Sequence, residues 1–339
     1  MSGSFVFVVT NPSSNRFAKA EVGVRYPELR FAYSRPGLLT WKCEKASPEF
    51  GANLVFARVS GQSIGLFESI EEAIEEARKR FPEATCAHVF PRDPHNQEAW
   101  AESERLAQLV QAQGLRIGCA QGQELVLDFV VAPKEPLFVG CHRHFPFRWA
   151  CPGGLPRFSL PEAAPSRGYL KLKEALLWSG IEPRPGEIAI ELGASPGGSS
   201  WAWLEMGLEL WAFDPAPLDP RLCAFSKQLG GRLHFFQEAC GAIRRAHLPR
   251  KAHYLASDLN LAPQVAMRYV LRTASHFRSF RALFVTLKIN DDLVLKALPS
   301  IIESLRGMAF GLGLEHVRAT HLPSHGREIL AVALRKDKP

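Results

Sequence analysis

The sequence lacks cysteine pairs at the C-x-x-C spacing of metal-binding and redox motifs. Its seven cysteines are scattered along the chain, at positions 43, 86, 119, 141, 151, 223 and 240. An odd number of scattered cysteines indicates neither a zinc site nor a disulfide framework, and it fits free thiols in a reducing compartment. We therefore expect no bound metal and no disulfide framework.

Long apolar runs are also missing. No stretch approaches the ~18–20 apolar residues of a membrane span, and the N-terminus lacks a basic region followed by a long apolar core. These absences predict a cytoplasmic protein without a membrane segment. At ~100–200 residues per domain, the length of 339 residues suggests two domains, and the hydrophobic content of 46% is enough for a packed core in each.

The first half of the chain lacks net charge. Basic and acidic residues balance over 1–150, so residues 151–339 supply the whole net charge of +7. An acidic polymer such as RNA would be attracted mainly to the second half. The excess is modest, and ordinary surface charge is the alternative.

The N-terminal region 1–141 is predicted to be an α/β domain. Strand-like runs rich in β-branched and aromatic residues occur at 5–9, 53–57, 85–90 and 125–131. Helices are expected from the Ser69–Glu72 capping box to position 81, and over 97–113. No set of residues in this region indicates chemistry, so we expect it to bind or position a partner.

Residues 142–165 are rich in proline and are predicted to form a linker. Basic and aromatic side chains alternate in this segment, Arg157 among them, as suits phosphate pairing and base stacking on RNA. Burial of the aromatics against the domains is an equally good alternative. His142 and His144 have no third ligand nearby in the sequence, so we interpret them as surface or RNA-facing residues.

A glycine-rich loop in the C-terminal region 166–339 carries the clearest signal. The run Glu191-Leu-Gly-Ala-Ser-Pro-Gly-Gly198 follows a strand-like segment and precedes a helix start at Ser199. Such a turn lets a ligand approach the backbone and its N–H groups. The G-x-G-x-x-G pattern of dinucleotide-binding proteins is absent. Asp214 ends the next apolar run about 20 residues further on, where an acidic side chain can accept hydrogen bonds from ribose hydroxyls.

Alternating strands and helices in this region predict a doubly wound sheet. Strands are expected at 188–192, 208–213, 233–236, 253–257 and 282–288. The segments 314–320 and 329–334, joined by a turn through Pro323 and Gly326, predict a closing hairpin.

Several motifs in this order resemble the FtsJ-like 2′-O-ribose methyltransferases. The run Ser166 to Glu174 matches the element S-R-x-x-x-K-L-x-E, and the loop 191–198 matches an acidic residue followed by G-x-x-P-G-G. The catalytic Lys-Asp-Lys-Glu tetrad of that family has counterparts here in Lys171, Asp258, Lys288 and Glu328. The resemblance implies an α/β fold with a Rossmann-like S-adenosylmethionine-dependent methyltransferase domain, a doubly wound sheet whose last hairpin is antiparallel.

The resemblance also implies a set of residues that bind S-adenosylmethionine. These are Glu191, Gly193, Ser195, Pro196, Gly197, Gly198, Trp201, Asp214, Glu238 and Asp258. One position departs from the family: where an acidic residue often contacts the adenine amine, this chain has Ala239, so Glu238 is the substitute.

A narrower likeness points to the branch of this family that methylates a cytidine ribose in bacterial 23S rRNA. The junction 156–167 resembles that branch strongly, and the segments 53–58 and 129–140 resemble parts of its THUMP-containing N-terminal portion. The implied partner is 23S rRNA or a large-subunit precursor, with no obligate protein partner. Candidate RNA contacts are Arg157, Arg167, Arg268 and Arg272. Two alternatives remain: a 2′-O-methyltransferase of another RNA such as tRNA, or a catalytically idle RNA-binding ribosome-assembly factor.

The residue types of the tetrad suit proton removal from a ribose hydroxyl. An unperturbed lysine, with a pKa near ~10.4, is a poor base at neutral pH. A second ammonium and burial favour the neutral amine, whereas carboxylates oppose it. We assign Lys288 as the group that faces the 2′-hydroxyl, Lys171 as its electrostatic neighbour, and Asp258 and Glu328 as the groups that orient both.

Overall fold

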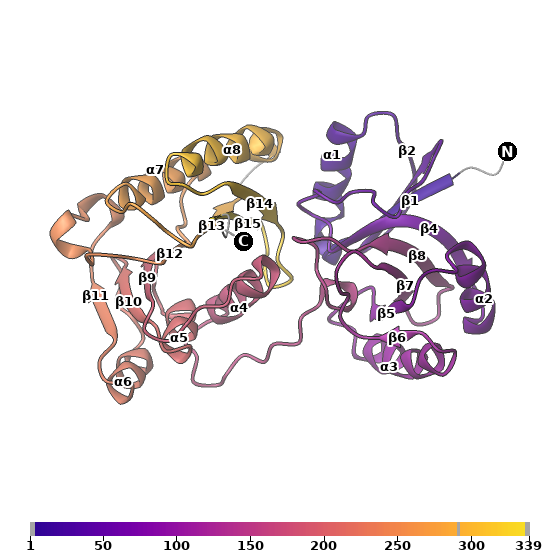
Figure 1. Cartoon of the computed structure of the whole chain (residues 1–339), viewed down its shortest axis with the longest axis horizontal. Helices are drawn as coiled ribbons and strands as arrows, with labels where there is room; N and C mark the ends of the chain where they lie inside the picture. Colours follow the sequence, from indigo (N-terminus) through magenta and orange to yellow (C-terminus); the bar gives the residue numbers. More distant parts are fainter. Residues whose placement is uncertain (1–3, 290–291, 336–339) are drawn as a thin grey trace. The chain divides into compact units, whose positions relative to one another are not determined.

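The computed structural model describes residues 4–289 and 292–335, which divide into two compact units, 1–157 and 158–339 (Figure 1). Among the described residues, no helix has the length and apolar character needed to cross a membrane.

The N-terminal unit is built on an eight-stranded sheet in the order β2-β3-β1-β4-β8-β7-β5-β6 (Figure 1). Its strands are β1 (Ser4–Val9), β2 (Arg30–Arg35), β3 (Leu38–Cys43), β4 (Val59–Phe67), β5 (Cys86–Pro91), β6 (Arg116–Ile117), β7 (Leu125–Val131) and β8 (Leu137–Arg143). The helices are α1 (Asn15–Arg25), α2 (Ile70–Arg80) and α3 (Gln97–Ala112), with short 3-10 turns at Pro12–Ser14 and Pro152–Gly154. The side chain of Ser69 caps α2 by accepting a hydrogen bond from the backbone N–H of Glu72, as the capping box predicts.

The strand expected at 53–57 does not form. The carboxylate of Glu21, buried on α1, accepts hydrogen bonds from the backbone N–H groups of Val55 and Phe56 at 2.8–3.1 Å. These two backbone N–H groups are therefore not available to pair with a neighbouring strand, and the segment forms a turn and a bend instead. A sequence pattern of apolar residues cannot reveal such a long-range acceptor.

The expected linker 142–165 is only partly a linker, because residues 142–157 belong to the N-terminal unit. Arg148 donates to the carbonyl oxygens of Phe50 and Ser60 at 2.7 and 3.0 Å, and Trp149 is 4% exposed. Gly153 lies so close to Phe90 of β5 that a Cβ atom would clash with its ring. The alternative of aromatic burial thus holds for this stretch, and the boundary between the units falls after Arg157.

The C-terminal unit has a seven-stranded sheet in the order β11-β10-β9-β12-β13-β15-β14. Its strands are β9 (Ile188–Leu192), β10 (Glu209–Phe213), β11 (Leu233–Phe236), β12 (Tyr254–Ser257), β13 (Ala282–Lys288), β14 (His316–Thr320) and β15 (Glu328–Leu334). Strand β15 is antiparallel to both of its neighbours, β13 and β14, whereas β9 to β13 pair in parallel. The expected doubly wound sheet with an antiparallel last hairpin is therefore confirmed.

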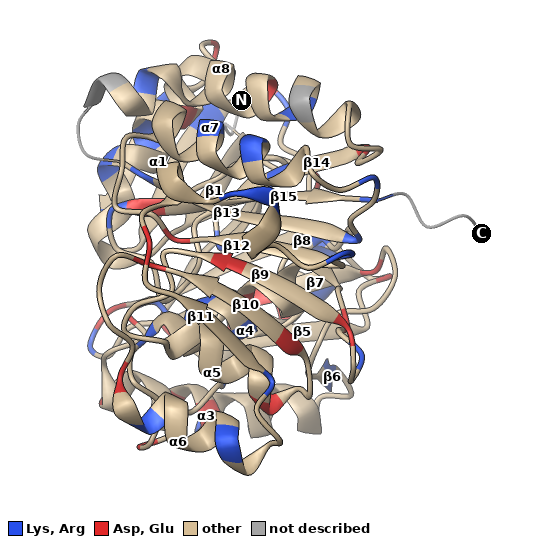
Figure 2. Cartoon of the chain, turned by 90° about the vertical axis from the view of Figure 1, so that its left-hand side faces the viewer, with Lys and Arg blue, Asp and Glu red and all other residues tan. Residues whose placement is uncertain are grey.

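Helices cover both faces of this sheet. Helices α4 (Gly168–Ser179), α5 (Gly198–Glu205) and α6 (Pro220–Gln228) lie on one face, and α7 (Pro263–Ala274) and α8 (Asp292–Phe310) lie on the other (Figures 1 and 2). Short 3-10 turns occur at Cys240–Ala242 and Arg245–His247.

The chain order reverses between β9 and β12, which are neighbours in the sheet. From β9 the chain proceeds outward through β10 and β11, and then returns to the other side of β9 to form β12. Open α/β sheets bind ligands at the carboxyl ends of the strands at such a reversal point. The glycine-rich loop and Asp258 directly follow these two strands, so the fold places both of them there.

Candidate active site

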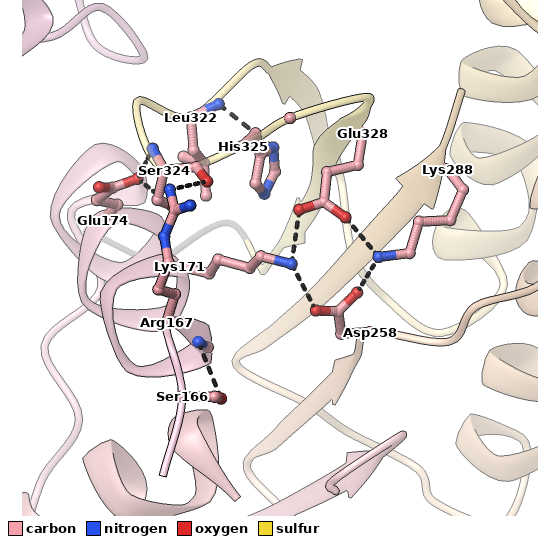
Figure 3. Close-up of polar contacts among 12 residues, drawn as sticks. Ser166, Arg167, Lys171, Glu174, Asp258, Lys288, Leu322, Ser324, His325 and Glu328 are labelled. Atoms are coloured by element: carbon pink, nitrogen blue, oxygen red, sulfur yellow. Dashed lines mark hydrogen bonds and ion pairs between the residues drawn. The ribbon is translucent and has the colours of Figure 1, made fainter. Parts of the chain in front are cut away.

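Lys171, Asp258, Lys288 and Glu328 form a closed ring of ion pairs (Figure 3). The Lys171 ammonium donates to Asp258 Oδ2 at 2.9 Å and pairs with Glu328 Oε1 at 2.6 Å. The Lys288 ammonium donates to Asp258 Oδ1 at 2.7 Å and to Glu328 Oε2. Each carboxylate thus bridges both lysines, and each lysine bridges both carboxylates.

The sheet itself explains why residues distant in sequence meet here. Lys288 ends β13 and Glu328 begins the antiparallel β15, where the two residues are direct cross-strand partners. Asp258 follows β12, the other neighbour of β13. Lys171 lies in the first turns of α4, the helix that covers this edge. The antiparallel direction of β15 brings its first residue, rather than its last, to the carboxyl edge of the parallel strands.

The mutual charges of the ring set the ionisation of its members. Burial alone would raise the pKa of Asp258, but the ammonium groups of Lys171 and Lys288 outweigh it and hold that pKa below its usual value. Burial would lower the pKa of Lys288, but Asp258 and Glu328 outweigh it and raise the pKa. Lys288 is therefore an ammonium group at neutral pH in this arrangement.

The ring is sheltered but accessible. Its side chains are between 10% and 30% exposed, Glu328 the least and Asp258 the most. A small cavity borders it, lined among others by Lys171, Glu191, Ser199 and Thr286. Of the four ring residues, Lys171 and Asp258 line this cavity.

The three glycines of the loop at 193–198 are needed for contacts within the protein. Gly193 has a φ of +82°, and a Cβ atom on it would lie 2.6 Å from the carbonyl oxygen of Asp258. Gly197 has a φ of +115° and packs against Leu222 of α6. A Cβ atom on Gly198 would lie 2.5 Å from the carbonyl oxygen of Ser166. The sequence suggests that the glycines admit a ligand, whereas the structure shows that they admit β12, α6 and the start of α4.

Glu191, at the end of β9, is 2% exposed and binds the helix that follows the loop. Its carboxylate accepts a hydrogen bond from Ser200 Oγ at 2.6 Å and another from Ser199 Oγ. Burial raises the pKa of Glu191 to about 7, the hydroxyls lower it, and the charges of Asp258 and Asp214 raise it further. Three carboxyl groups are therefore close enough at this edge to repel one another.

Asp214, after β10, holds the glycine-rich loop. Its Oδ2 accepts a hydrogen bond from the backbone N–H of Ser195 at 3.0 Å, and its Oδ1 accepts one from Ala216 at 2.8 Å. Each carboxylate oxygen has a further lone pair available for a ligand hydroxyl. The carbonyl oxygen of Pro196 accepts a hydrogen bond from Asp219 at 3.0 Å, which ties the loop to the start of α6.

Two other expected cofactor residues have protein partners. Trp201 on α5 stacks on Phe225 of α6, with ring centroids 4.0 Å apart and an interplanar angle of 3°. Glu238, after β11, pairs with His247 Nδ1 at 3.1 Å. The structure therefore uses Trp201 in packing between helices, and it places Glu238 beside the imidazole of His247.

A second polar group supports the ring, and its members Glu174 and Ser324 are not among the site residues predicted from the sequence. Glu174 on α4 accepts hydrogen bonds from the backbone N–H and the hydroxyl of Ser324, at 3.0 and 2.7 Å. Arg167 donates to the carbonyl oxygen of Ser324 at 3.1 Å. Together these contacts clamp the turn that leads into Glu328 onto the helix that carries Lys171 (Figure 3). Glu174 is part of the recognised motif, but its partner lies 150 positions away, so the sequence does not reveal the contact.

His325, on the same turn, is buried beside the ring. Burial, His321 and the ammonium groups of Lys171 and Lys288 lower its pKa well below the usual value. A neutral imidazole is thus placed next to the lysines, which adds no charge to the site.

The four arginines expected to contact RNA are exposed, and three of them also contact the protein. Arg157 pairs with Glu104 at 3.1 Å in the N-terminal unit, and Arg167 serves the clamp just described. Arg272 donates to the carbonyl oxygen of Gly241 at 3.1 Å, and it lies with Arg268 on the outer face of α7, where Figure 2 shows basic positions. The structure therefore groups only Arg268 and Arg272 on one exposed helix face.

The expectation that His142 and His144 lie on the surface is wrong. His142 is 2% exposed in β8, and His144 is 9% exposed. Asp128 and His88, which are far away in sequence, lie next to His142. These neighbours of His142 come from the adjacent strand β7 and from β5 beyond it.

The sheet order and the antiparallel last strand define the C-terminal unit as a Rossmann-like fold of the methyltransferase type. In sequence, the chain is homologous to proteins named Ribosomal RNA large subunit methyltransferase M. It is 49% identical over 74 residues to that of Halorhodospira halophila, covering 21% of this chain and 22% of the relative. It is 33% identical over 132 residues to that of Saccharophagus degradans, covering 37% and 35%. The chain thus matches about a fifth to a third of the length of these relatives. No family model matches the chain.

Similar solved structures are more distant. TrmN from Thermus thermophilus aligns with 14% identity and a TM-score of 0.36, covering 98% of this chain and all of that one. Fibrillarin from Aeropyrum pernix, solved with S-adenosyl-L-methionine, aligns with 15% identity and a TM-score of 0.37, covering 63% and 83%.

Proposed function

We propose that this protein transfers a methyl group from S-adenosylmethionine to the ribose 2′-oxygen of a nucleotide, a cytidine, in 23S rRNA. The observation that carries the proposal is the ring of Lys171, Asp258, Lys288 and Glu328 at the carboxyl edge of a methyltransferase-type sheet. The homologues named for methylation of large-subunit rRNA support the choice of substrate.

The residues around the glycine-rich loop suit a cationic adenosine cofactor. Burial, and in addition the charges of Asp258 and Asp214, raise the pKa of Glu191, so the two aspartates place negative charge at this edge. A sulfonium ion is attracted to such an edge, and Asp214 retains acceptor capacity for ribose hydroxyls. We place the cofactor against the loop 193–198, with Asp214 on its ribose and Glu238 near its base. When bound, the cofactor supplies an activated methyl group with a good leaving group.

The protein's part in the reaction is to position the 2′-oxygen and to take its proton. Lys288 would face the hydroxyl from the end of β13, and its neutral amine would accept the proton as the oxygen becomes bonded to carbon. Lys171 favours that neutral form by its charge, whereas Asp258 and Glu328 favour the ammonium form and fix its direction. The carboxylates therefore make Lys288 well oriented and also keep its neutral form scarce at pH 7.

RNA selection is assigned to two regions. The exposed face of α7 with Arg268 and Arg272 would contact phosphates near the site. The N-terminal unit, a THUMP-like α/β domain in this proposal, would select and position the RNA. Action on rRNA would place the protein in the cytoplasm.

Mapping of ribose 2′-O-methyl groups in total RNA, from cells with and without the gene, tests this proposal. We expect one 23S rRNA cytidine to lose its methyl group in the deletion strain and to regain it with the wild-type gene, but not with Lys288→Ala. Loss of a methyl group in tRNA alone would assign a different substrate. An unchanged map, together with a defect in large-subunit assembly, would instead identify an idle assembly factor.

A further inference from the structure

Outside the proposed active site, three buried polar side chains meet in the sheet of the N-terminal unit. His88 lies on β5, Asp128 on β7 and His142 on β8, and their exposed fractions are 0%, 0% and 2%. One candidate ligand atom from each lies within 4.8 Å of the others. His142 Nδ1 is 2.6 Å from Asp128 Oδ2, and His88 Nδ1 is 3.7 Å from Asp128 Oδ1.

The strand register explains this convergence. Strands β5, β7 and β8 are neighbours in the sheet (Figure 1), and His88 is the direct cross-strand partner of Asp128. Gly140 is the partner of Asp128 on the other side, and the ring of Phe7 packs where a side chain on Gly140 would lie. His142, two residues further along β8, therefore lies on the same face and reaches Asp128 diagonally. Three adjacent strands hold the group more rigidly than loops would.

The hydrogen bonds of this group are incomplete. Among the described residues, both ring nitrogens of His88 and Asp128 Oδ1 lack a partner with hydrogen-bond geometry. The backbone of Gly118 lies near enough to His88 to raise its pKa slightly, but not in that geometry. Buried polar atoms without partners are costly and rare in native proteins. A buried hydrogen-bonded pair of His142 and Asp128 would leave His88 unexplained.

We propose that His88, Asp128 and His142 bind a divalent transition-metal ion, zinc by preference, as a structural centre of the N-terminal unit. Imidazole nitrogen and carboxylate oxygen are ligands that Zn²⁺ takes at ~2.0–2.2 Å, so side-chain shifts of about 1 Å bring all three to one ion. The ion replaces the hydrogen bond between His142 and Asp128, and it gives Asp128 Oδ1 and His88 a partner. Water completes the coordination.

The charges of the site agree with such an ion. Burial lowers the pKa of His88 and of His142 to about 3, so both rings are neutral, the form that coordinates metal. Burial also raises the pKa of Asp128 to about 8, because the carboxylate lacks enough nearby positive charge. The positive charge of Arg148 lowers the pKa of Asp128, but its N–H groups donate to the carbonyl oxygens of Phe50, Ser60 and Arg143. A divalent ion would supply the missing charge directly.

The full-length protein provides the test. After purification and dialysis against ZnSO₄ followed by metal-free buffer, we expect about one zinc per chain by elemental analysis. X-ray absorption of that sample should show nitrogen and oxygen neighbours near ~2.0–2.1 Å and no sulfur near ~2.3 Å. This second measurement matters because the chain has free cysteines, and thiolates are also ligands for zinc. A folded wild-type protein that retains no zinc, or zinc bound through sulfur, would overturn the proposal.

Variants locate the ion. Asp128→Asn and His88→Gln preserve side-chain size and should reduce bound zinc at least tenfold, while far-ultraviolet circular dichroism shows that each is folded. His95→Ala removes an exposed histidine of the same unit and should retain the zinc. Equal loss of zinc in His95→Ala would count against the site. If the first two variants fail to fold, the zinc content and absorption spectrum of the wild type still decide the question.

Discussion

Lys288 combines two properties that oppose each other in a general base. Its amine is fixed by two carboxylates at the end of β13, which gives it a defined direction. The same carboxylates raise its pKa, which makes the neutral form rare near pH 7. The residue is therefore suited to a reaction in which orientation matters more than the abundance of the base.

Replacement of Lys288 tests its direct participation. We expect Lys288→Ala to slow single-turnover methyl transfer by ~100-fold or more, the range for a positioned acid–base group, with little change in RNA or cofactor affinity. Lys288→Arg should not restore the rate, because a guanidinium stays protonated. Lys173→Ala, which removes a lysine of α4 that pairs with Glu205 outside the ring, is the matched control and should be close to wild type. A near-normal rate in Lys288→Ala at saturating RNA would exclude the mechanism.

The pH dependence of the same step follows from the raised pKa. If neutral Lys288 accepts the proton, the wild-type single-turnover rate should rise by roughly tenfold per pH unit from pH 6 to 9, because the neutral fraction grows in that proportion below the pKa. The slope should disappear in Lys288→Ala. A flat wild-type profile would show that Lys288 acts as an ammonium group that only orients the oxygen.

The proposed cofactor contact of Asp214 is open to a conservative substitution. Asp214→Asn keeps the size of the side chain and one carbonyl oxygen, but removes the charge that a ribose hydroxyl would meet. We expect calorimetry to show S-adenosylmethionine binding weakened by more than ~1 kcal/mol. Asp219→Asn, at the N-cap of α6, is a nearby control that should bind normally. Equal affinity in the wild type and Asp214→Asn would remove Asp214 from the cofactor site.

At the level of elements, the sequence predicts the C-terminal sheet well, because each strand is a short apolar run bounded by turns. The bounds of β9, β11 and β13 agree with the sequence-based segments to the residue. Order along the chain also predicts which residues reach the carboxyl edge. The sequence does not reveal contacts such as the clamp of Glu174 on Ser324, because no local pattern links a polar side chain to a turn 150 positions away. For the same reason, the sequence does not reveal the partners of His142 or the role of Glu21 as an acceptor.

The clamp predicts a pH-dependent stability. Burial raises the pKa of Glu174 to about 7 from an ordinary 4.5, against the opposing hydrogen bonds from Ser324 and the charges of Arg167 and Lys171. Because the pKa is higher in the folded state than in the unfolded state, protonation of Glu174 favours the folded state. The contribution of this carboxyl to the free energy of unfolding is therefore complete below about pH 4.5 and is lost as the pH rises through about 7.

The unfolding free energy of Glu174→Gln, relative to that of the wild type, is therefore expected to increase by on the order of 1–3 kcal/mol from pH 5 to pH 8. Glutamine does not titrate, so its own contribution stays constant. Denaturant unfolding of both proteins at the two pH values measures the difference. Glu182→Gln, at an exposed site of the same unit, should show no such trend. A constant difference between Glu174→Gln and the wild type would show that the carboxyl does not titrate in this range.

On the scale of the whole molecule, the residues proposed for the chemistry all lie in one unit, whereas the proposed RNA contacts are divided between the two units. The ring, the glycine-rich loop and the clamp all lie within 158–339, and the buried His-Asp-His group lies within 1–157. Each unit has its own sheet and its own buried apolar residues. The structure moves the boundary to Phe158, because Arg148 and Trp149 anchor the preceding stretch to the first unit.

This boundary defines a fragment that separates the two roles. A chain of residues 158–339 should fold, as judged by circular dichroism and a cooperative thermal transition, because its sheet and both helical layers are complete. It should bind S-adenosylmethionine with an affinity close to that of the full chain, since the loop, Asp214 and Asp258 are all present. It should also lose most of the methylation of 23S rRNA, because the unit assigned to RNA positioning is missing and proximity is a large part of the rate.

A fragment that begins at Ser166 is the matched comparison, since it lacks the segment 158–165 and tests whether that stretch is needed for folding. If the fragment 158–339 is folded and methylates the rRNA as fast as the intact chain, the N-terminal unit does not position the substrate, and its function must be sought elsewhere.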